Sequence, residues 1–128
     1  MTQLIDLFAT NLARNGMIVH RGQHPTVDGA VESEAAYGLA DPGSVVMVAS
    51  PSQSRAESLI PDVHVALITE DRVLPGLAEL LAELKGRLPS GLVIVSGPSR
   101  SADIEQQLVT GVHGPKEQHV AILPPAGS

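Results

Sequence analysis

The segment VSGPSRSADIEQQLVTGVHGP, from Val95 to Pro115, brings an arginine, a histidine, serines and carboxylates together between two glycine–proline turns. An apolar run ends at Gly97, and a helical pattern begins near Ser101. The free N–H groups at such a helix start carry the positive end of the helix dipole and favour an anion. Arg100 would add a bidentate partner for a carboxylate or phosphate. An ordinary strand-to-helix turn with a solvated arginine fits the same residues, so both interpretations stay open.

The second turn, GVHGP, places His113 between two glycines. Gly111 is a natural residue to end the preceding helix. The imidazole that follows could serve as an acid, a base or a hydrogen-bond donor. Alternatively, His113 bonds a backbone carbonyl and only holds the turn. At the start of the same helix, Asp103 and Gln106 fit a capping box.

Two upstream features could also reach a ligand. The turn ADPGS contains Gly43 and Ser44 and leads into a strand, although Asp-Pro-Gly is also a common β-turn sequence. Arg55 could meet a carboxylate of a ligand, with an exposed salt bridge as the alternative. These residues extend the candidate anion site beyond the Gly97–Pro115 segment.

Several other classes of site lack their motifs. The chain has no phosphate-loop, dinucleotide-binding or nucleophile-elbow pattern. Its histidines lack the spacing of a metal site, so we predict no metal. His20 and His24 flank a turn, whereas His64 and His119 begin strands, where partial burial and internal hydrogen bonds would satisfy them.

The apolar pattern predicts short strands that alternate with helices. The predicted strands are Met17–Arg21, Gly43–Ser50, Val63–Thr69, Gly91–Gly97 and Gln118–Pro124. The predicted helices are residues 2–16, 74–88 and 101–111, and the polar segment around Val31–Tyr37 is expected to be a loop with at most a short helix. This alternation indicates one layered α/β domain over residues 1–128 with a mostly parallel sheet and a frayed tail from Pro124. The short step from Ser50 to Val63 favours some antiparallel or mixed pairing.

Composition excludes several functions. The 128-residue chain has a net charge of −6 and 2% aromatic residues, so neither basic patches nor stacking platforms for nucleic acid are expected. It contains no cysteine, which excludes disulfides and cysteine-ligated iron–sulfur clusters. No apolar run approaches the roughly 20 residues of a membrane span, and no signal peptide is evident. We therefore expect a soluble cytoplasmic protein.

The run GPSRSADIEQQLVTGVHGP resembles the motif of the LUD domain family, the lactate-utilisation protein C group. The upstream stretches ADPGSVVMVAS and SRAESLIPDVHVALI are similar to two further stretches of that family. Pro42 stands where the family usually has threonine, which removes one hydroxyl and one N–H. The matching positions are Gly43, Ser44, Arg55, Pro61, His64, Gly97, Pro98, Ser99, Arg100, Asp103, Glu105, Gly111, His113, Gly114 and Pro115.

The resemblance implies a three-layer α/β fold like that of ribose-5-phosphate isomerase, glucosamine-6-phosphate deaminase and CoA transferases. It also implies a role in oxidising L-lactate to pyruvate beside iron–sulfur partner subunits, with no cofactor bound by this chain itself. His113, Asp103 and Glu105 would be the acid–base members of the site. The ligand-binding positions would be Gly97, Ser99, Arg100, Ser101, Gly43, Ser44 and Arg55. A non-catalytic assembly subunit and a stand-alone enzyme of the same fold group are the alternatives, and enzymatic activity stays open.

Overall fold

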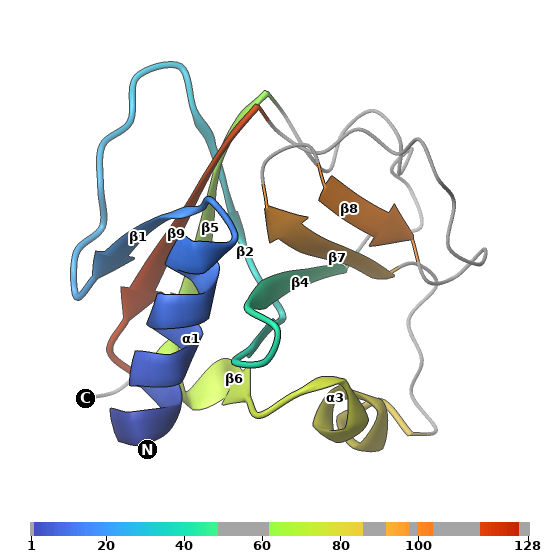
Figure 1. The fold of residues 1–128 in the computed structure, drawn as a ribbon. Helices are drawn as coiled ribbons and strands as arrows, with labels where there is room; N and C mark the ends of the chain where they lie inside the picture. Colours follow the sequence, from blue (N-terminus) through green and yellow to red (C-terminus); the bar gives the residue numbers. More distant parts are fainter. Residues whose placement is uncertain (1, 49–61, 86–91, 98–99, 104–115, 126–128) are drawn as a thin grey trace.

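In a computed structural model, which describes residues 2–48, 62–85, 92–97, 100–103 and 116–125, the chain forms two β-sheets and two α-helices (Figure 1). The strands of sheet A, in spatial order, are β1 (Ile18–Arg21), β9 (Glu117–Leu123), β5 (Val63–Thr69) and β2 (Val31–Glu34). Those of sheet B are β6 (Val73–Leu74), β3 (Tyr37–Leu39), β4 (Ser44–Val48), β7 (Leu92–Gly97) and β8 (Arg100–Asp103). The helices are α1 (Thr2–Arg14) and α3 (Leu77–Glu83), and the 3-10 turn η1 (Glu70–Arg72) joins β5 to β6.

Sheet A is parallel throughout. Its two central strands, β5 and β9, pair over their whole seven-residue lengths. Neighbouring residues on each strand are fully buried, as in Val65–Ala66 and Val120–Ala121. Because successive side chains point to opposite faces, both faces of these strands are covered, and this explains their continuous apolar sequences. The predicted α/β class with a parallel sheet is confirmed.

Sheet B is mainly antiparallel. The pairs β3–β4, β4–β7 and β7–β8 are antiparallel, and β3–β6 is parallel. The predicted strand over Gly43–Ser50 is therefore confirmed as β4, which pairs with β3 and β7 instead of continuing the parallel sheet. Antiparallel pairing is thus present as expected, but not across the short step from Ser50 to Val63, because β4 and β5 lie in different sheets.

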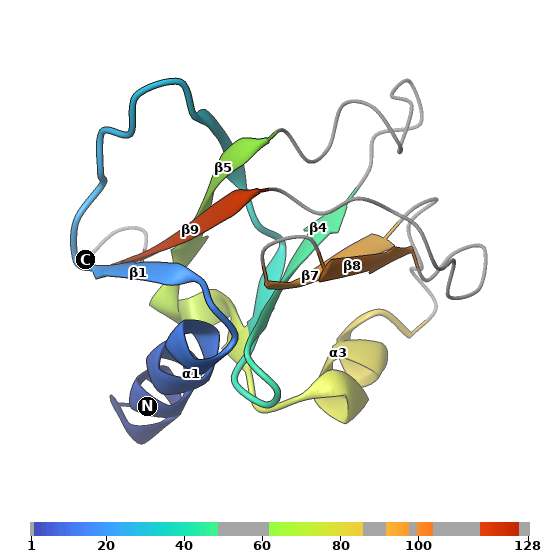
Figure 2. The ribbon, with the colours of Figure 1, turned by 45° about the horizontal axis from the view of Figure 1, so that its top comes forward.

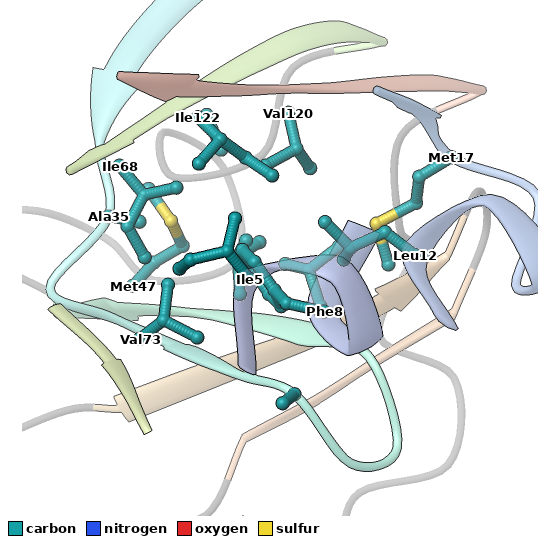
Figure 3. Close-up of a cluster of buried hydrophobic side chains, with 14 of the residues drawn as sticks. Ile5, Phe8, Leu12, Met17, Ala35, Met47, Ile68, Val73, Val120 and Ile122 are labelled. Atoms are coloured by element: carbon teal, nitrogen blue, oxygen red, sulfur yellow. The ribbon is translucent and has the colours of Figure 1, made fainter. Parts of the chain in front are cut away.

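Helix α1 fills the space between the two sheets (Figure 3). Ile5, Phe8 and Leu12 lie on one helical face and are almost completely buried. The apolar spacing of Leu4, Leu7, Phe8 and Leu12 favours an inward Leu7, but that side chain is 46% exposed, and Ile5 takes the inward position. Figure 3 shows these helix residues between side chains of sheet A and of sheet B, namely Ile68, Val120, Ile122, Met47 and Val73.

Helix α3 covers the other face of sheet B (Figure 2). Leu80 and Leu84 pack against Leu39, Val46 and Leu92. Sheet A, sheet B and α3 thus form three successive layers, with α1 between the sheets. Among the helices of the described residues, none has the length and apolar character needed to cross a bilayer.

Two secondary-structure predictions are wrong. The segment Val31–Tyr37 contains no helix: Val31–Glu34 is strand β2, and Tyr37 begins β3. Its polar sequence is misleading because, among the described strands, β2 borders β5 alone, so its two glutamates can face water. The helix predicted to start at Ser101 does not start there, since Arg100–Asp103 pairs with β7 as strand β8. Residues 104–111 of that prediction lie outside the described residues.

Replacing Phe8 with alanine tests the central role of α1. Phe8 is fully buried between the sheets, so Phe8→Ala should lower the free energy of unfolding by about 3–5 kcal/mol. The neighbouring Leu7 is 46% exposed, and Leu7→Ala should change the free energy by less than about 1 kcal/mol. Urea unfolding followed by circular dichroism measures both values, and equal losses would contradict the placement of α1.

Candidate functional site

The predicted site residues fall into two groups. Gly43, Ser44 and Gly97 are described with their surroundings, and Arg100, Ser101 and Asp103 are described as members of strand β8. The remaining predicted residues, Arg55, Ser99, Glu105 and His113, lie outside the described residues.

Strand register brings the described members of the predicted site to one end of sheet B. Val45 of β4 and Ser101 of β8 both pair with Val95 of β7, and Arg100 pairs with Gly97. The start of β4, the end of β7 and the start of β8 therefore lie side by side. At this end the hydroxyl oxygens of Ser44 and Ser96 are 3.2 Å apart.

Helix α1 holds the loop that leads into β4. Asn11 donates from its side-chain amide to Ala40 O at 2.8 Å, and Asn15 donates to Pro42 O and Gly43 O at 2.8 and 2.9 Å. Gly43 has a φ of 96°, and a Cβ there would lie 2.6 Å from the backbone carbon of Asn11. The close approach to α1 thus explains why glycine occupies position 43. The next residue, Ser44, is fully buried and faces Ser96.

The β8 strand changes how an anion could be held at this end of sheet B. Ser101 and Asp103 belong to the antiparallel β7–β8 ladder, so the predicted helix N-terminus at Ser101 is wrong. A helix start at Ser101 therefore cannot supply N–H groups to an anion. The alternative start after Asp103 falls on residues 104–111, which lie outside the described residues.

A second polar cluster lies on the core-facing side of sheet A, where Ser33, His64 and Gln118 form a hydrogen-bonded row. The Ser33 Oγ lies 2.7 Å from His64 Nε2, and His64 Nδ1 lies 3.0 Å from Gln118 Oε1. His64 and Gln118 are completely buried. Parallel pairing joins β2, β5 and β9. This pairing brings His64 next to Ser33, 31 positions away in the chain, and next to Gln118, 54 positions away.

The hydrogen-bonding partners of Gln118 determine the tautomer of His64. The amide nitrogen of Gln118 donates to His119 O at 2.7 Å and approaches His64 O at 3.4 Å. Both partners are acceptors, so the amide oxygen must face His64 Nδ1 and accept its proton. Nε2 then carries the lone pair, and the Ser33 hydroxyl donates to it. Burial lowers the pKa of His64 below its ordinary value of 6.5, and the hydrogen bond to Gln118 opposes this only in part.

The opposite face of sheet A carries a row formed by His20, His119 and Glu117. His119 Nε2 lies 2.6 Å from Glu117 Oε2, and His119 Nδ1 lies 2.9 Å from His20 Nε2. The two rings stack, with centroids 5.2 Å apart. Burial and the neighbouring His119 lower the pKa of His20. Within the described part of the chain, no cluster of three metal-ligating side chains is found.

A hollow of about 420 Å³ lies at the carboxyl ends of three parallel strands. Glu34, Thr69 and Leu123 end β2, β5 and β9 respectively, and all three line it. Arg72 also lines the hollow. Its Nε donates a hydrogen bond to Ala36 O at 2.9 Å, and its Cζ lies 4.4 Å from the ring centre of Tyr37. Open α/β sheets commonly bind ligands at this edge, although the sequence motifs did not indicate it.

The lowered pKa of His64 predicts how stability depends on pH. In the unfolded chain the imidazole takes up a proton near pH 6.5, and in the folded chain it does so only at lower pH. The unfolded state therefore binds more protons, and the free energy of unfolding should fall as the pH drops through 6.5. Urea unfolding at pH 7.5 and 5.5 measures this loss. It should be smaller in His64→Gln, and an unchanged loss in that variant would contradict the assignment.

Comparison with known proteins covers most of the chain. Residues 32–123 match the family model of the LUD domain. Lactate utilization protein C of Halalkalibacterium halodurans is 41% identical over 87 residues, which are 63% of this chain and 38% of that protein. Lactate utilization protein C of Bacillus licheniformis is 40% identical over 83 residues, or 60% of this chain and 35% of that protein. The matched region thus spans well under half the length of these relatives.

A solved structure shows the same fold over nearly the whole chain. The crystal structure of a DUF162 family protein from Deinococcus radiodurans superposes with a TM-score of 0.64 and 18% identity, covering 95% of this chain and 97% of that one. The fold of α1 and β1, which precede the matched family region, is therefore shared as well. The family match over residues 32–123 shows that the chain belongs to the LUD domain family.

Proposed function

We propose that this chain acts in L-lactate utilisation as a LUD-type component and binds a small carboxylate or phosphate-bearing ligand at the end of sheet B. One observation carries the proposal: the β4–β7–β8 register brings Gly43, Ser44, Gly97 and Arg100 to the same end of one sheet. These residues come from two stretches about fifty positions apart in the sequence. The names of the relatives, lactate utilization protein C, support the choice of pathway.

Each predicted residue has a role in this proposal. Arg100 and Arg55 would contact the anion, because a guanidinium pairs with carboxylate or phosphate through two parallel hydrogen bonds. His113, Asp103 and Glu105 would be the acid–base members. The ligand would be lined by backbone and hydroxyl groups from Gly43, Ser44, Gly97, Ser99 and Ser101.

Redox chemistry in this proposal belongs to partner subunits. Oxidation of lactate to pyruvate releases two electrons and two protons, which an acceptor must take up. The chain has no cysteine, so it lacks the thiolate ligands that usually hold an iron–sulfur cluster. Its proposed part is therefore to hold the carboxylate, while iron–sulfur partners accept the electrons.

Thermal melts in the presence of ligands test the binding proposal. L-lactate, pyruvate, inorganic phosphate and coenzyme A at millimolar concentration are the probes, and at least one should raise the melting temperature. Arg100→Ala should weaken binding of that ligand about tenfold, equivalent to about 1.4 kcal/mol. Arg14→Ala, which changes an exposed arginine at the end of α1, is the matched control and should leave the affinity unchanged. Absence of stabilisation by all four probes would refute the proposal.

Exposed leucines on α3 favour assembly with a partner as a second function. Leu77 and Leu81 are four residues apart on one side of the helix and are 46% and 52% exposed. Among the described leucines of this segment, Leu80 and Leu84 are the ones buried against sheet B. The exposed pair would dock an iron–sulfur partner, and this role needs no ligand at the end of sheet B.

Charge substitution on α3 separates assembly from ligand binding. Leu81→Lys should abolish co-purification with iron–sulfur partner subunits, because it places a charge within the apolar contact. Leu7→Lys is the control, since Leu7 is also 46% exposed but lies on α1, and it should not affect co-purification. If Arg100→Ala or His113→Ala abolishes the complex while Leu81→Lys preserves it, assembly through α3 is wrong.

A further inference from the structure

We propose that Ser33 is a nucleophile, activated by His64, that accepts an acyl group from a small ester or thioester. The Ser33 Oγ lies 2.7 Å from His64 Nε2, and Gln118 Oε1 lies 3.0 Å from Nδ1 of the same ring. A hydroxyl bonded to a base that is itself oriented by a third group is the arrangement of nucleophilic hydrolases. This site is separate from the proposed ligand site, because its members lie on sheet A and not on sheet B.

The direction of each hydrogen bond suits this chemistry. Gln118 keeps the proton on His64 Nδ1, so Nε2 presents a lone pair to the Ser33 hydroxyl. The hydroxyl is consequently a donor, and the imidazole can take its proton when Oγ attacks. Burial keeps the imidazole neutral near neutral pH, which preserves its ability to act as a base.

Within the hydrogen-bonded row the base, His64, is shielded from solvent, whereas the nucleophile, Ser33, is partly exposed. His64 and Gln118 are fully buried, so their hydrogen bonds are shielded from competing water. Ser33 is only partly buried and lies on β2, the last strand of sheet A within the described residues. In this proposal a small acyl donor approaches Ser33 from this edge.

The backbone next to Ser33 offers a donor for the developing negative charge. The N–H of Ala35 donates to Leu67 O at 2.9 Å, towards β5. N–H groups alternate between the two sides of a strand, so the N–H of Glu34 points away from β5, towards the sheet edge. In this proposal it donates to the oxyanion, as the N–H after the nucleophile does in other serine enzymes.

The reaction balances without a further reagent. Ser33 Oγ forms a bond to the acyl carbon, and its proton passes to His64 Nε2. The tetrahedral intermediate then collapses, the bond to the alcohol or thiol leaving group breaks, and His64 returns the proton to that group. Water then attacks the acyl carbon, and His64 takes a proton from the water and returns it to Ser33 Oγ. The bond between Oγ and the acyl carbon breaks, which releases a carboxylic acid and restores the Ser33 hydroxyl.

Labelling with a small alkyl fluorophosphonate tests the proposal, because the probe loses fluoride only to an activated hydroxyl. In the chain without substitutions, peptide mapping by mass spectrometry should find the adduct on Ser33. The rate of labelling of Ser33 should be about 100-fold higher than that of Ser96. Ser96 is a suitable comparison because its hydroxyl also bonds within a sheet but to Ser44, not to an imidazole. An unlabelled Ser33, or a rate no greater than that of Ser96, would overturn the proposal.

Three variants identify the base and control for folding. Ser33→Ala should abolish the adduct, and His64→Gln should abolish it while leaving the Ser33 hydroxyl in place. Val31→Ala removes an exposed side chain from the same strand and should label like the unmodified chain. Undiminished labelling of Ser33 in a folded His64→Gln variant would exclude His64 as the base. If His64→Gln does not fold, the site of labelling in the unmodified chain decides the question.

Discussion

The parallel pairing of β5 with β9 is the constraint on which the rest of the structure depends. Seven residue pairs join the two strands, from Val63 with Glu117 to Thr69 with Leu123. Side chains alternate between faces, so a shift of one residue would turn the core-facing set of either strand outwards. The same shift would separate His64 from Gln118. Core packing and the buried imidazole row therefore depend on one register.

Helix α1 extends this constraint to sheet B. Its apolar face packs on both sheets, and its asparagines hold the loop before β4. The approach is close, since a Cβ on Gly38 would lie 2.5 Å from Phe8 Cζ. The proposed ligand site on sheet B and the polar row on sheet A are thus positioned by a common core, although they share no residue.

The family relationship explains the fold better than it explains the chemistry. The LUD match starts at residue 32, within β2, yet the solved relative also matches most of the region before it. That region supplies α1, which the core requires. At 18% identity such a likeness reflects shared architecture, and function has to be argued from the sites. This chain has two polar regions of different character: the end of sheet B, where we propose an anion site, and the hydrogen-bonded row around His64 on sheet A.

The sequence by itself determined most elements and their buried faces. Strands β5, β7 and β9 and helix α1 follow from short apolar runs and helical periodicity, which are local properties. It also determined that thiolate chemistry is absent. By contrast, the polar strand β2 was missed, and a helix was predicted where β8 begins, because pairing with a neighbouring strand outweighs local propensity.

Only the tertiary structure decided which polar residues meet. Ser33, Gln118 and His20 belong to no motif, and His64 and His119 were expected to be satisfied individually at strand starts. The contacts Ser33–His64, His64–Gln118 and His20–His119 join residues that are 31, 54 and 99 positions apart in the chain. Such contacts arise from strand order and register, which long-range packing sets and local sequence does not encode.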